Sequence, residues 1–160
     1  MLHPPAPCRI SVSHTPGLAM LAVAPFPVGI DTEALRSIPV ANITGQVLTP
    51  HERRAVLAEP EGPARTAAFL RCWTRKEAVL KAVGIGIVAD LTTLETRPED
   101  PGPTRVTAGT LAPPTDWWVT EVSVPEGWTA SVAYPAGTGR PIAVRQLRVP
   151  RERQARHAPR

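Results

Sequence analysis

The chain has 160 residues, the size of a single domain and enough to bury a hydrophobic core. Hydrophobic residues make up 42% of it, which excludes wholesale disorder, and no apolar run is long enough to cross a bilayer. The formal net charge is +4, but residues 140–160 hold seven arginines and one glutamate, so the remaining chain carries a net charge of −2. A basic tail is therefore attached to a slightly acidic body.

The first elements expected after a Pro-rich lead-in (residues 1–8) are strands. Residues 9–13 and 18–24 are short runs rich in Ile, Val, Leu and Ala, which predict a hairpin of buried strands. A third strand is expected over residues 28–31, ending at the acidic Asp31.

Two helices are expected in the middle of the chain. In the segment LTPHERRAVLAEP, Thr49 is a good N-cap, Pro50 suits the first helical position and Glu52 completes a capping box. The second helix should cover residues 64–83 and end at Gly84 in the left-handed conformation. Within this helix we expect Cys72 to be a small buried hydrophobic residue, because two cysteines are too few for a disulfide framework.

Further strands are expected after the helices. Trp118, Val122 and Val124 alternate with polar residues, which is typical of a half-exposed antiparallel sheet. Helices in the middle with strands on both sides predict an α+β domain over residues 9–135. Residues 136–160 are expected to form a disordered Arg-rich tail. The expected strands cover residues 91–97, 105–111, 117–124 and 128–134.

Charged residues in the second helix have two interpretations. Glu77 precedes Lys81 by four positions, the favoured order for an ordinary helix ion pair worth about 0.2–0.5 kcal/mol. Trp73 shares their face, and an aromatic residue beside a charged pair is common at the edge of a core. The other interpretation is that this face of the helix takes part in chemistry.

A pair of acidic residues earlier in the chain strengthens the chemical interpretation. Asp31 and Glu33 alternate along an extended segment, so both carboxylates can point the same way, although such a pair alone is usually solvated surface. With Glu77 they would form an all-oxygen cluster suited to Mg²⁺, which keeps sites for phosphate oxygens. Lys76 and Lys81 beside this cluster would receive anions.

His14 is a further candidate for contact with phosphate. It lies at the end of an expected strand and is followed by Thr15 and Gly17. A lone histidine at a strand end is, however, more often structural.

Three segments of the chain form a recognisable series: ISVSHT (10–15), VGIDTE (28–33) and FLRCWTRKEAVLKAVGIGI (69–87). In this order and spacing, they resemble the 4′-phosphopantetheinyl transferase superfamily, whose signature is G-[IV]-D-x-E followed by W-[ST]-x-K-E-[AS]-x-x-K. The resemblance covers residues 9–135, and the strand pair before the first motif is similar to the larger, surfactin-synthetase-activating branch.

The resemblance implies a fold, an activity and partners. The fold would be the phosphopantetheinyl transferase-like α+β arrangement of antiparallel sheet and helices. The activity would be transfer of the 4′-phosphopantetheine arm of coenzyme A to a serine of an acyl or peptidyl carrier protein, with release of 3′,5′-ADP. A cytoplasmic location is expected by elimination, because the chain opens with no signal-peptide pattern.

The resemblance also implies roles for individual residues. Asp31, Glu33 and Glu77 would hold Mg²⁺, or Mn²⁺, against the pyrophosphate of coenzyme A. Glu77 would take the proton of the serine, and Lys81 would stabilise or protonate the leaving group. Contact with the phosphates of the coenzyme is implied for three cationic side chains: His14, Lys76 and Lys81.

The larger branch of the family consists of pseudo-dimers with coenzyme A between two similar halves. This chain resembles one complete second half with only the last strands of the first. Basic residues that the first half gives to the 3′-phosphate have no counterpart here. We therefore expect an exposed apolar surface with one of two consequences. Either the chain self-associates, or it is a truncated product that is poorly soluble and inactive.

Two other functions stay open. One is a catalytically impaired half-domain that binds coenzyme A or a carrier protein without turnover. The other is a nucleic-acid binder that uses the arginine-rich tail. We disfavour the second because the tail has no interleaved aromatic residues and the body is net acidic.

Overall fold

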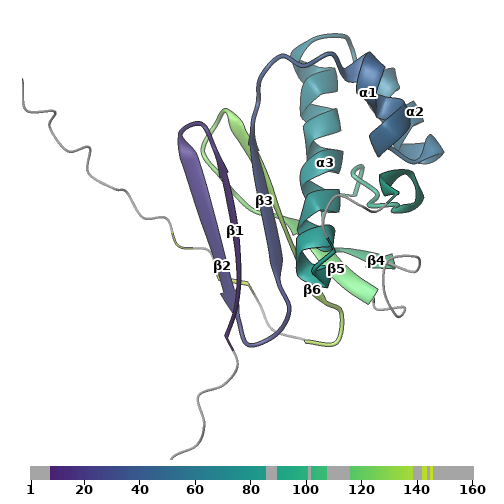
Figure 1. Ribbon diagram of the computed structural model, residues 1–160. Coiled ribbons are helices and arrows are strands. Elements are labelled where there is room, and N and C mark those ends of the chain that lie inside the picture. Colours follow the sequence, from purple (N-terminus) through teal and green to yellow (C-terminus); the bar gives the residue numbers. More distant parts are fainter. Residues whose placement is uncertain are drawn as a thin grey trace, which may run out of the picture.

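The computed structural model describes residues 8–85, 90–100, 102–107, 116–138, 142–143 and 145. This part of the chain forms a β-hairpin, a four-stranded antiparallel sheet and three α-helices, which confirms the α+β prediction (Figure 1). No helix in these ranges is long and apolar enough to cross a membrane. The predicted Pro-rich lead-in and the predicted disordered tail lie, apart from a few residues, outside the described residues.

The strands form two sheets. The hairpin pairs β1 (Arg9–Thr15) with β2 (Leu18–Ala24). The larger sheet has the strand order β3-β6-β5-β4 with antiparallel neighbours, and β3 continues beyond Asp31, where the sequence predicted its end. Its strands are β3 (Gly29–Ala34), β4 (Thr104–Thr107), β5 (Asp116–Glu121) and β6 (Trp128–Pro135).

Two of the three helices begin or end as the sequence predicted. In α2 (Pro50–Ala58) the hydroxyl of Thr49 accepts the backbone N–H of Glu52, and the carboxylate of Glu52 accepts the backbone N–H of Thr49. This reciprocal capping box satisfies two donors that an uncapped helix would leave free. The long helix α3 (Pro63–Val83) ends at Gly84 with φ 79°, a left-handed conformation that glycine adopts readily.

The sequence did not predict α1 (Val40–Val47). Its sequence, VANITGQV, contains three β-branched valine and isoleucine residues and a glycine, which are poor helix formers. Three residues at helical spacing, Val40, Thr44 and Val47, are nevertheless buried. Tertiary packing of this face therefore overrides the weak local preference.

The predicted strand over residues 91–97 is wrong. The segment begins with a short 3₁₀-helix, Leu91–Thr93, which Asp90 caps by accepting the backbone N–H of Thr92 at 3.0 Å. The rest of it forms no strand. The predicted strand over residues 105–111 is observed only as β4, because residues 108–111 lie outside the described ranges.

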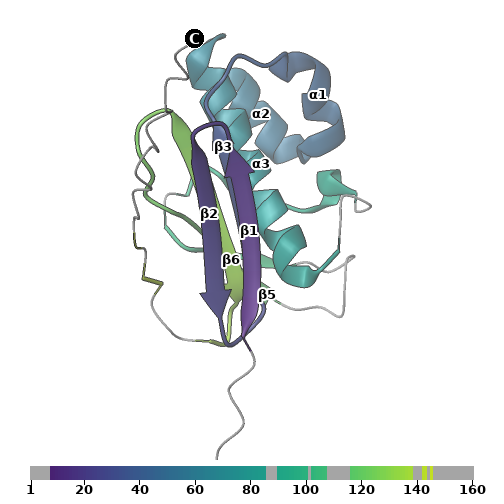
Figure 2. The ribbon, with the colours of Figure 1, turned by 60° about the vertical axis from the view of Figure 1, so that its left-hand side comes forward.

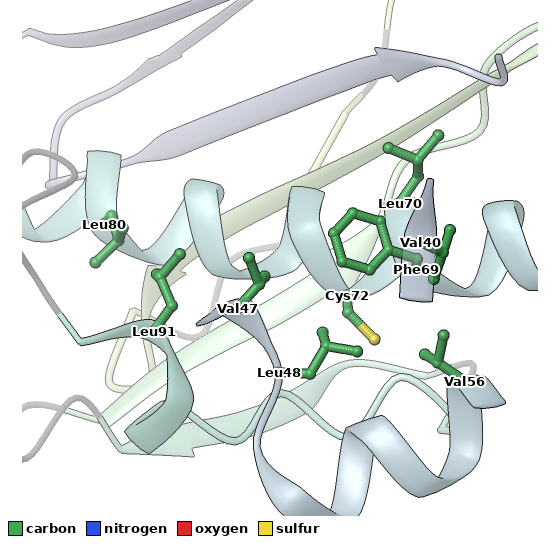
Figure 3. Packing of buried hydrophobic residues seen from close by; sticks show 9 residues of the cluster. All are labelled: Val40, Val47, Leu48, Val56, Phe69, Leu70, Cys72, Leu80 and Leu91. Carbon is green, nitrogen blue, oxygen red and sulfur yellow. The ribbon is translucent and has the colours of Figure 1, made fainter. Parts of the chain in front are cut away.

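Helix α3 occupies the centre of the molecule. One side packs on the sheet, where Ala78, Val79 and Ala82 meet buried residues of β4, β5 and β6. The opposite side packs on α1 and α2 through Phe69, Cys72 and Leu80 (Figure 3). Because both sides are covered, even charged residues of this helix are buried, which an ordinary surface helix would expose.

Cys72 lies within the cluster that joins α3 to α1 and α2, as Figure 3 shows. Its side chain is fully buried, which confirms the prediction of a small buried hydrophobic residue. Burial raises the pKa of its thiol far above the usual range, because the thiolate would lose its hydration there.

The hairpin has one covered and one exposed face, so the prediction of buried strands holds for one face only. Met20, Ala22 and Ala24 of β2 pack against apolar residues of the sheet. In Figure 2 the hairpin lies in front of β6 and along the side of β3. Its outer face carries four large apolar side chains that are 56–67% exposed: Ile10, Val12, Leu21 and Val23.

Side-chain hydroxyls join the hairpin to the larger sheet. Every second residue of β1 has a hydroxyl directed at β3, and each hydroxyl accepts one backbone N–H of that strand. These bonds satisfy the donors that an edge strand would otherwise leave unpaired. The three bonds run from Ile30 N–H to Ser11 Oγ, from Thr32 N–H to Ser13 Oγ and from Ala34 N–H to Thr15 Oγ1, each at 3.1 Å.

Candidate active site

Gly29 allows β3 to lie directly against α3. A Cβ atom at this position would be 1.9 Å from the carbonyl oxygen of Ala78 and 2.5 Å from the backbone nitrogen of Ala82. Both are backbone atoms of a buried helix, which cannot move aside as the end of a long side chain can. The glycine of VGIDTE therefore brings the carboxylates that follow it up to the helix.

The carboxylate of Asp31 accepts two hydrogen bonds from side chains. Its Oδ1 accepts hydrogen bonds from Lys81 Nζ at 2.7 Å and from Ser13 Oγ at 2.9 Å, while Lys81 Nζ also donates to the carbonyl oxygen of Ile30 at 3.1 Å. Lys81 therefore forms its ion pair with a neighbouring strand, in place of the ordinary helix pair with Glu77. The other oxygen, Asp31 Oδ2, is buried without a hydrogen-bond partner.

Glu77 lies beside this pair on α3 and is buried. Its Oε1 also has no hydrogen-bond partner. Burial raises the pKa of Glu77, and the negative charge of Asp31 raises it further, against the opposing effect of Lys81. Like-charged groups affect each other in this way only when they are close, so β3 and α3 bring these two carboxylates together.

Glu33 extends the acidic group along β3. Burial is the largest cause that raises the pKa of Glu33, and the negative charge of Asp31 is the second. The positive charges of Arg36 and Lys81 lower this pKa, as does a hydrogen bond from Trp73. Glu33 and Asp31 lie on the same face of the strand, as their alternation predicted. The structure thus places Asp31, Glu33, Glu77 and Lys81 in one group.

The chemistry of this group fits a hard divalent cation. Two buried carboxylate oxygens without partners, Asp31 Oδ2 and Glu77 Oε1, are available as ligands, and a cation would relieve the repulsion that raises the pKa of Glu77. In the part of the chain that the structure describes, no group of three or more acidic, histidine or cysteine side chains is arranged to hold a metal ion. Mg²⁺ commonly binds to only one or two carboxylates, because it keeps several waters and takes phosphate oxygens.

Lys76 lies on a different side of α3, and its position does not fit the predicted contact with phosphate. Its side chain is fully buried, with Nζ 2.7 Å from Glu52 Oε2. It also donates to the carbonyl oxygen of Leu91 at 2.8 Å and to that of Leu94. These bonds tie α3 to α2, to the 3₁₀-helix and to the residue that follows it, so the role of Lys76 in this structure is to hold the fold.

His14 is exposed on β1, next to Ser13 but on the opposite face of the strand. It shares the outer face of the hairpin with Val12 and faces Ala19 across the hairpin. A contact between His14 and a phosphate therefore stays a prediction, and it would have to be made from that outer face. The β1 residue that contacts the acidic group is Ser13, which the sequence analysis did not single out. The alternation of hydroxyl residues in ISVSHT was the available signal.

Comparison with known proteins identifies a family for this chain. Residues 27–133 match the family model of the 4′-phosphopantetheinyl transferase superfamily. Over 94 residues the chain is 32% identical to the 4′-phosphopantetheinyl transferase psf-1 of Bacillus pumilus. That alignment covers 59% of this chain and 40% of the relative, so the chain corresponds to less than half of the length of that protein.

Proposed function

The chain belongs to the 4′-phosphopantetheinyl transferase superfamily, and on that premise we propose that it transfers the 4′-phosphopantetheine arm of coenzyme A to a serine of an acyl or peptidyl carrier protein. The second product is 3′,5′-ADP. The observation that carries the proposal is the group formed by the buried Asp31 and Glu77 with the half-buried Lys81. One carboxylate oxygen of Asp31 and one of Glu77 have no hydrogen-bond partner there, although Lys81 pairs with the other oxygen of Asp31. An ordinary structural ion pair would leave neither oxygen unsatisfied.

Three carboxylates are the proposed cation ligands. Asp31, Glu33 and Glu77 would hold Mg²⁺ or Mn²⁺, which when bound neutralises charge on the pyrophosphate of coenzyme A. The free oxygens of Asp31 and Glu77 support this assignment, because oxygen ligands are the ones that these cations prefer.

Glu77 is the proposed general base. Oε1, which accepts no hydrogen bond, is assigned to the cation, so the second oxygen of the same carboxylate would take the proton of the carrier-protein serine. The raised pKa of Glu77 makes it a stronger base than an exposed glutamate.

Lys81 is the proposed partner of the leaving phosphate. An ammonium group has three N–H donors. Two of them are used by the Ile30 carbonyl oxygen and by Asp31 Oδ1, which leaves one for a phosphate oxygen. The same two bonds hold the ammonium in place, so little reorganisation is needed as negative charge develops on the leaving group.

The test is modification of a carrier protein by the purified chain. Coenzyme A, Mg²⁺ and an apo carrier protein are supplied, and mass spectrometry follows the gain of the phosphopantetheine arm. Glu77→Gln should abolish the gain while circular dichroism stays unchanged. Glu59→Gln, which makes the same change at an exposed position after α2, is the matched control. Normal rates in Glu77→Gln would refute the proposed base, and binding of coenzyme A without any mass gain would favour the binding-only function.

A further inference from the structure

The hydroxyl of Ser13 makes two contacts that fix its direction. Its oxygen accepts the backbone N–H of Thr32 at 3.1 Å and donates its single hydrogen to Asp31 Oδ1 at 2.9 Å. A serine hydroxyl has one hydrogen and can rotate freely unless its acceptor side is occupied. The bond from Thr32 therefore holds the hydrogen toward the carboxylate, in a buried position.

Asp31 is held asymmetrically as a result. Oδ1 accepts hydrogen bonds from both Ser13 and Lys81, while Oδ2 is buried and accepts none. The torsion that rotates an aspartate carboxylate has only a broad minimum, so the side chain does not set this orientation by itself. The two donors on Oδ1 do so, and they leave Oδ2 free.

We infer that Ser13 is a positioning residue, which orients Asp31 so that Oδ2 faces the cation of the proposed transferase site. The inference rests on the proposed function and adds a residue from outside the two acidic motifs. Loss of a hydrogen-bond partner of a ligating carboxylate typically lowers metal affinity by about 10- to 100-fold. Lys81 alone would hold Oδ1 by one bond, about which the carboxylate could still turn.

The chain provides a matched control for Ser13. Ser11 lies two residues earlier on β1, is also buried and also accepts a backbone N–H of β3, from Ile30 at 3.1 Å. Ser11 accepts a hydrogen bond from the backbone of β3, whereas Ser13 accepts such a bond and also donates one to the Asp31 carboxylate. Ser11→Ala and Ser13→Ala should therefore weaken the attachment of the hairpin equally, and only Ser13→Ala should disturb the carboxylate.

The experiment measures Mn²⁺ affinity by electron paramagnetic resonance on the full chain in the presence of coenzyme A. We expect Ser13→Ala to weaken Mn²⁺ binding by about 10- to 100-fold. Ser11→Ala should leave the affinity unchanged. Ser13→Thr should restore it, since Thr15 of the same strand already makes the equivalent bond to the backbone of β3. In an Asp31→Asn background, Ser13→Ala should cause no further loss, because both changes act through one carboxylate.

The outcomes separate this inference from the proposed function. If Asp31→Asn weakens Mn²⁺ binding but Ser13→Ala behaves like Ser11→Ala, the positioning role is overturned and the metal site stands. If Asp31→Asn itself has no effect, the metal site fails and the role of Ser13 fails with it. Should Ser13→Ala not fold, Ser13→Cys keeps a similar volume with only a weak donor and should show the same loss of affinity.

Discussion

Replacing Lys76 by methionine tests whether this lysine of the family signature holds the fold. Its ammonium and the carboxylate of Glu52 are both fully buried and lie 2.7 Å apart. Methionine keeps much of the side-chain volume but leaves the Glu52 carboxylate buried without its counter-charge. Breaking a buried ion pair on one side typically costs about 3–5 kcal/mol.

The structure suggests a cost at the lower end of this range, about 3 kcal/mol. Glu52 keeps three hydrogen bonds after the change: one from the backbone N–H of Thr49 at 3.0 Å, and two from the N–H and hydroxyl of Thr96 at 2.8 and 2.7 Å. These donors stabilise part of the charge that the lysine no longer balances. For a domain with a total stability of about 5–15 kcal/mol, the loss is still large.

Urea denaturation at neutral pH measures the effect on the free energy of unfolding. Arg54→Met removes an exposed cation from α2 and should change stability very little. Adding Glu52→Gln to Lys76→Met should recover part of the loss, because the buried position then carries no charge. A cost below about 1 kcal/mol for Lys76→Met, together with weaker binding of coenzyme A, would refute the structural role and restore the predicted contact with phosphate.

Three other predictions follow from the packing and the charges. Gly29→Ala should destabilise the chain by about 3 kcal/mol or more in thermal unfolding, because the added methyl group meets the backbone of α3. Gly45→Ala is the control: its added methyl group lies in open space on α1, so it should stabilise the chain by about 0.5–1 kcal/mol. A raised pKa of Glu77 means that its charged form destabilises the fold as pH rises above 4.5, the ordinary value. Glu77→Gln should therefore raise the melting temperature at pH 7.5 and leave it unchanged at pH 3.5, and a lower melting temperature at pH 7.5 would contradict the assigned shift. The apolar outer face of the hairpin should make the chain self-associate with rising concentration in light scattering, and Val12→Lys with Leu21→Glu should suppress this association. A monomeric wild-type chain at all concentrations would exclude it.

Local signals predicted the ends of helices well. Thr49, Pro50 and Glu52 lie within four residues of one another, and their capping box depends on no distant contact. The same holds for Gly84, whose lack of a side chain allows the left-handed end of α3. The acidic group was predictable as well, because alternation along an extended segment and one-turn spacing along a helix each determine a face.

The parts that depend on distant contacts were not predicted. Helix α1 forms despite weak local preference, because the body of the protein covers its buried face. Lys76 was placed beside the acidic cluster, and the family resemblance implied its contact with phosphate. Neighbouring residues of a helix, however, point in directions about 100° apart, so Lys76 and Glu77 do not share a face. The equivalents of Lys76 one turn away are Cys72 and Leu80, both in the apolar cluster, so helical spacing placed Lys76 on the side of the core.

The row of hydroxyls on β1 constrains how this strand can vary among related sequences. At positions 11, 13 and 15, only a small side chain with an acceptor oxygen can satisfy the N–H groups of β3, so serine and threonine are exchangeable there while alanine and valine are not. The outward positions between them, occupied by Val12 and His14, carry no such requirement. The two faces of one short strand thus meet two independent structural requirements. Its outer face can adapt to a new neighbour or ligand while its inner face continues to hold Asp31.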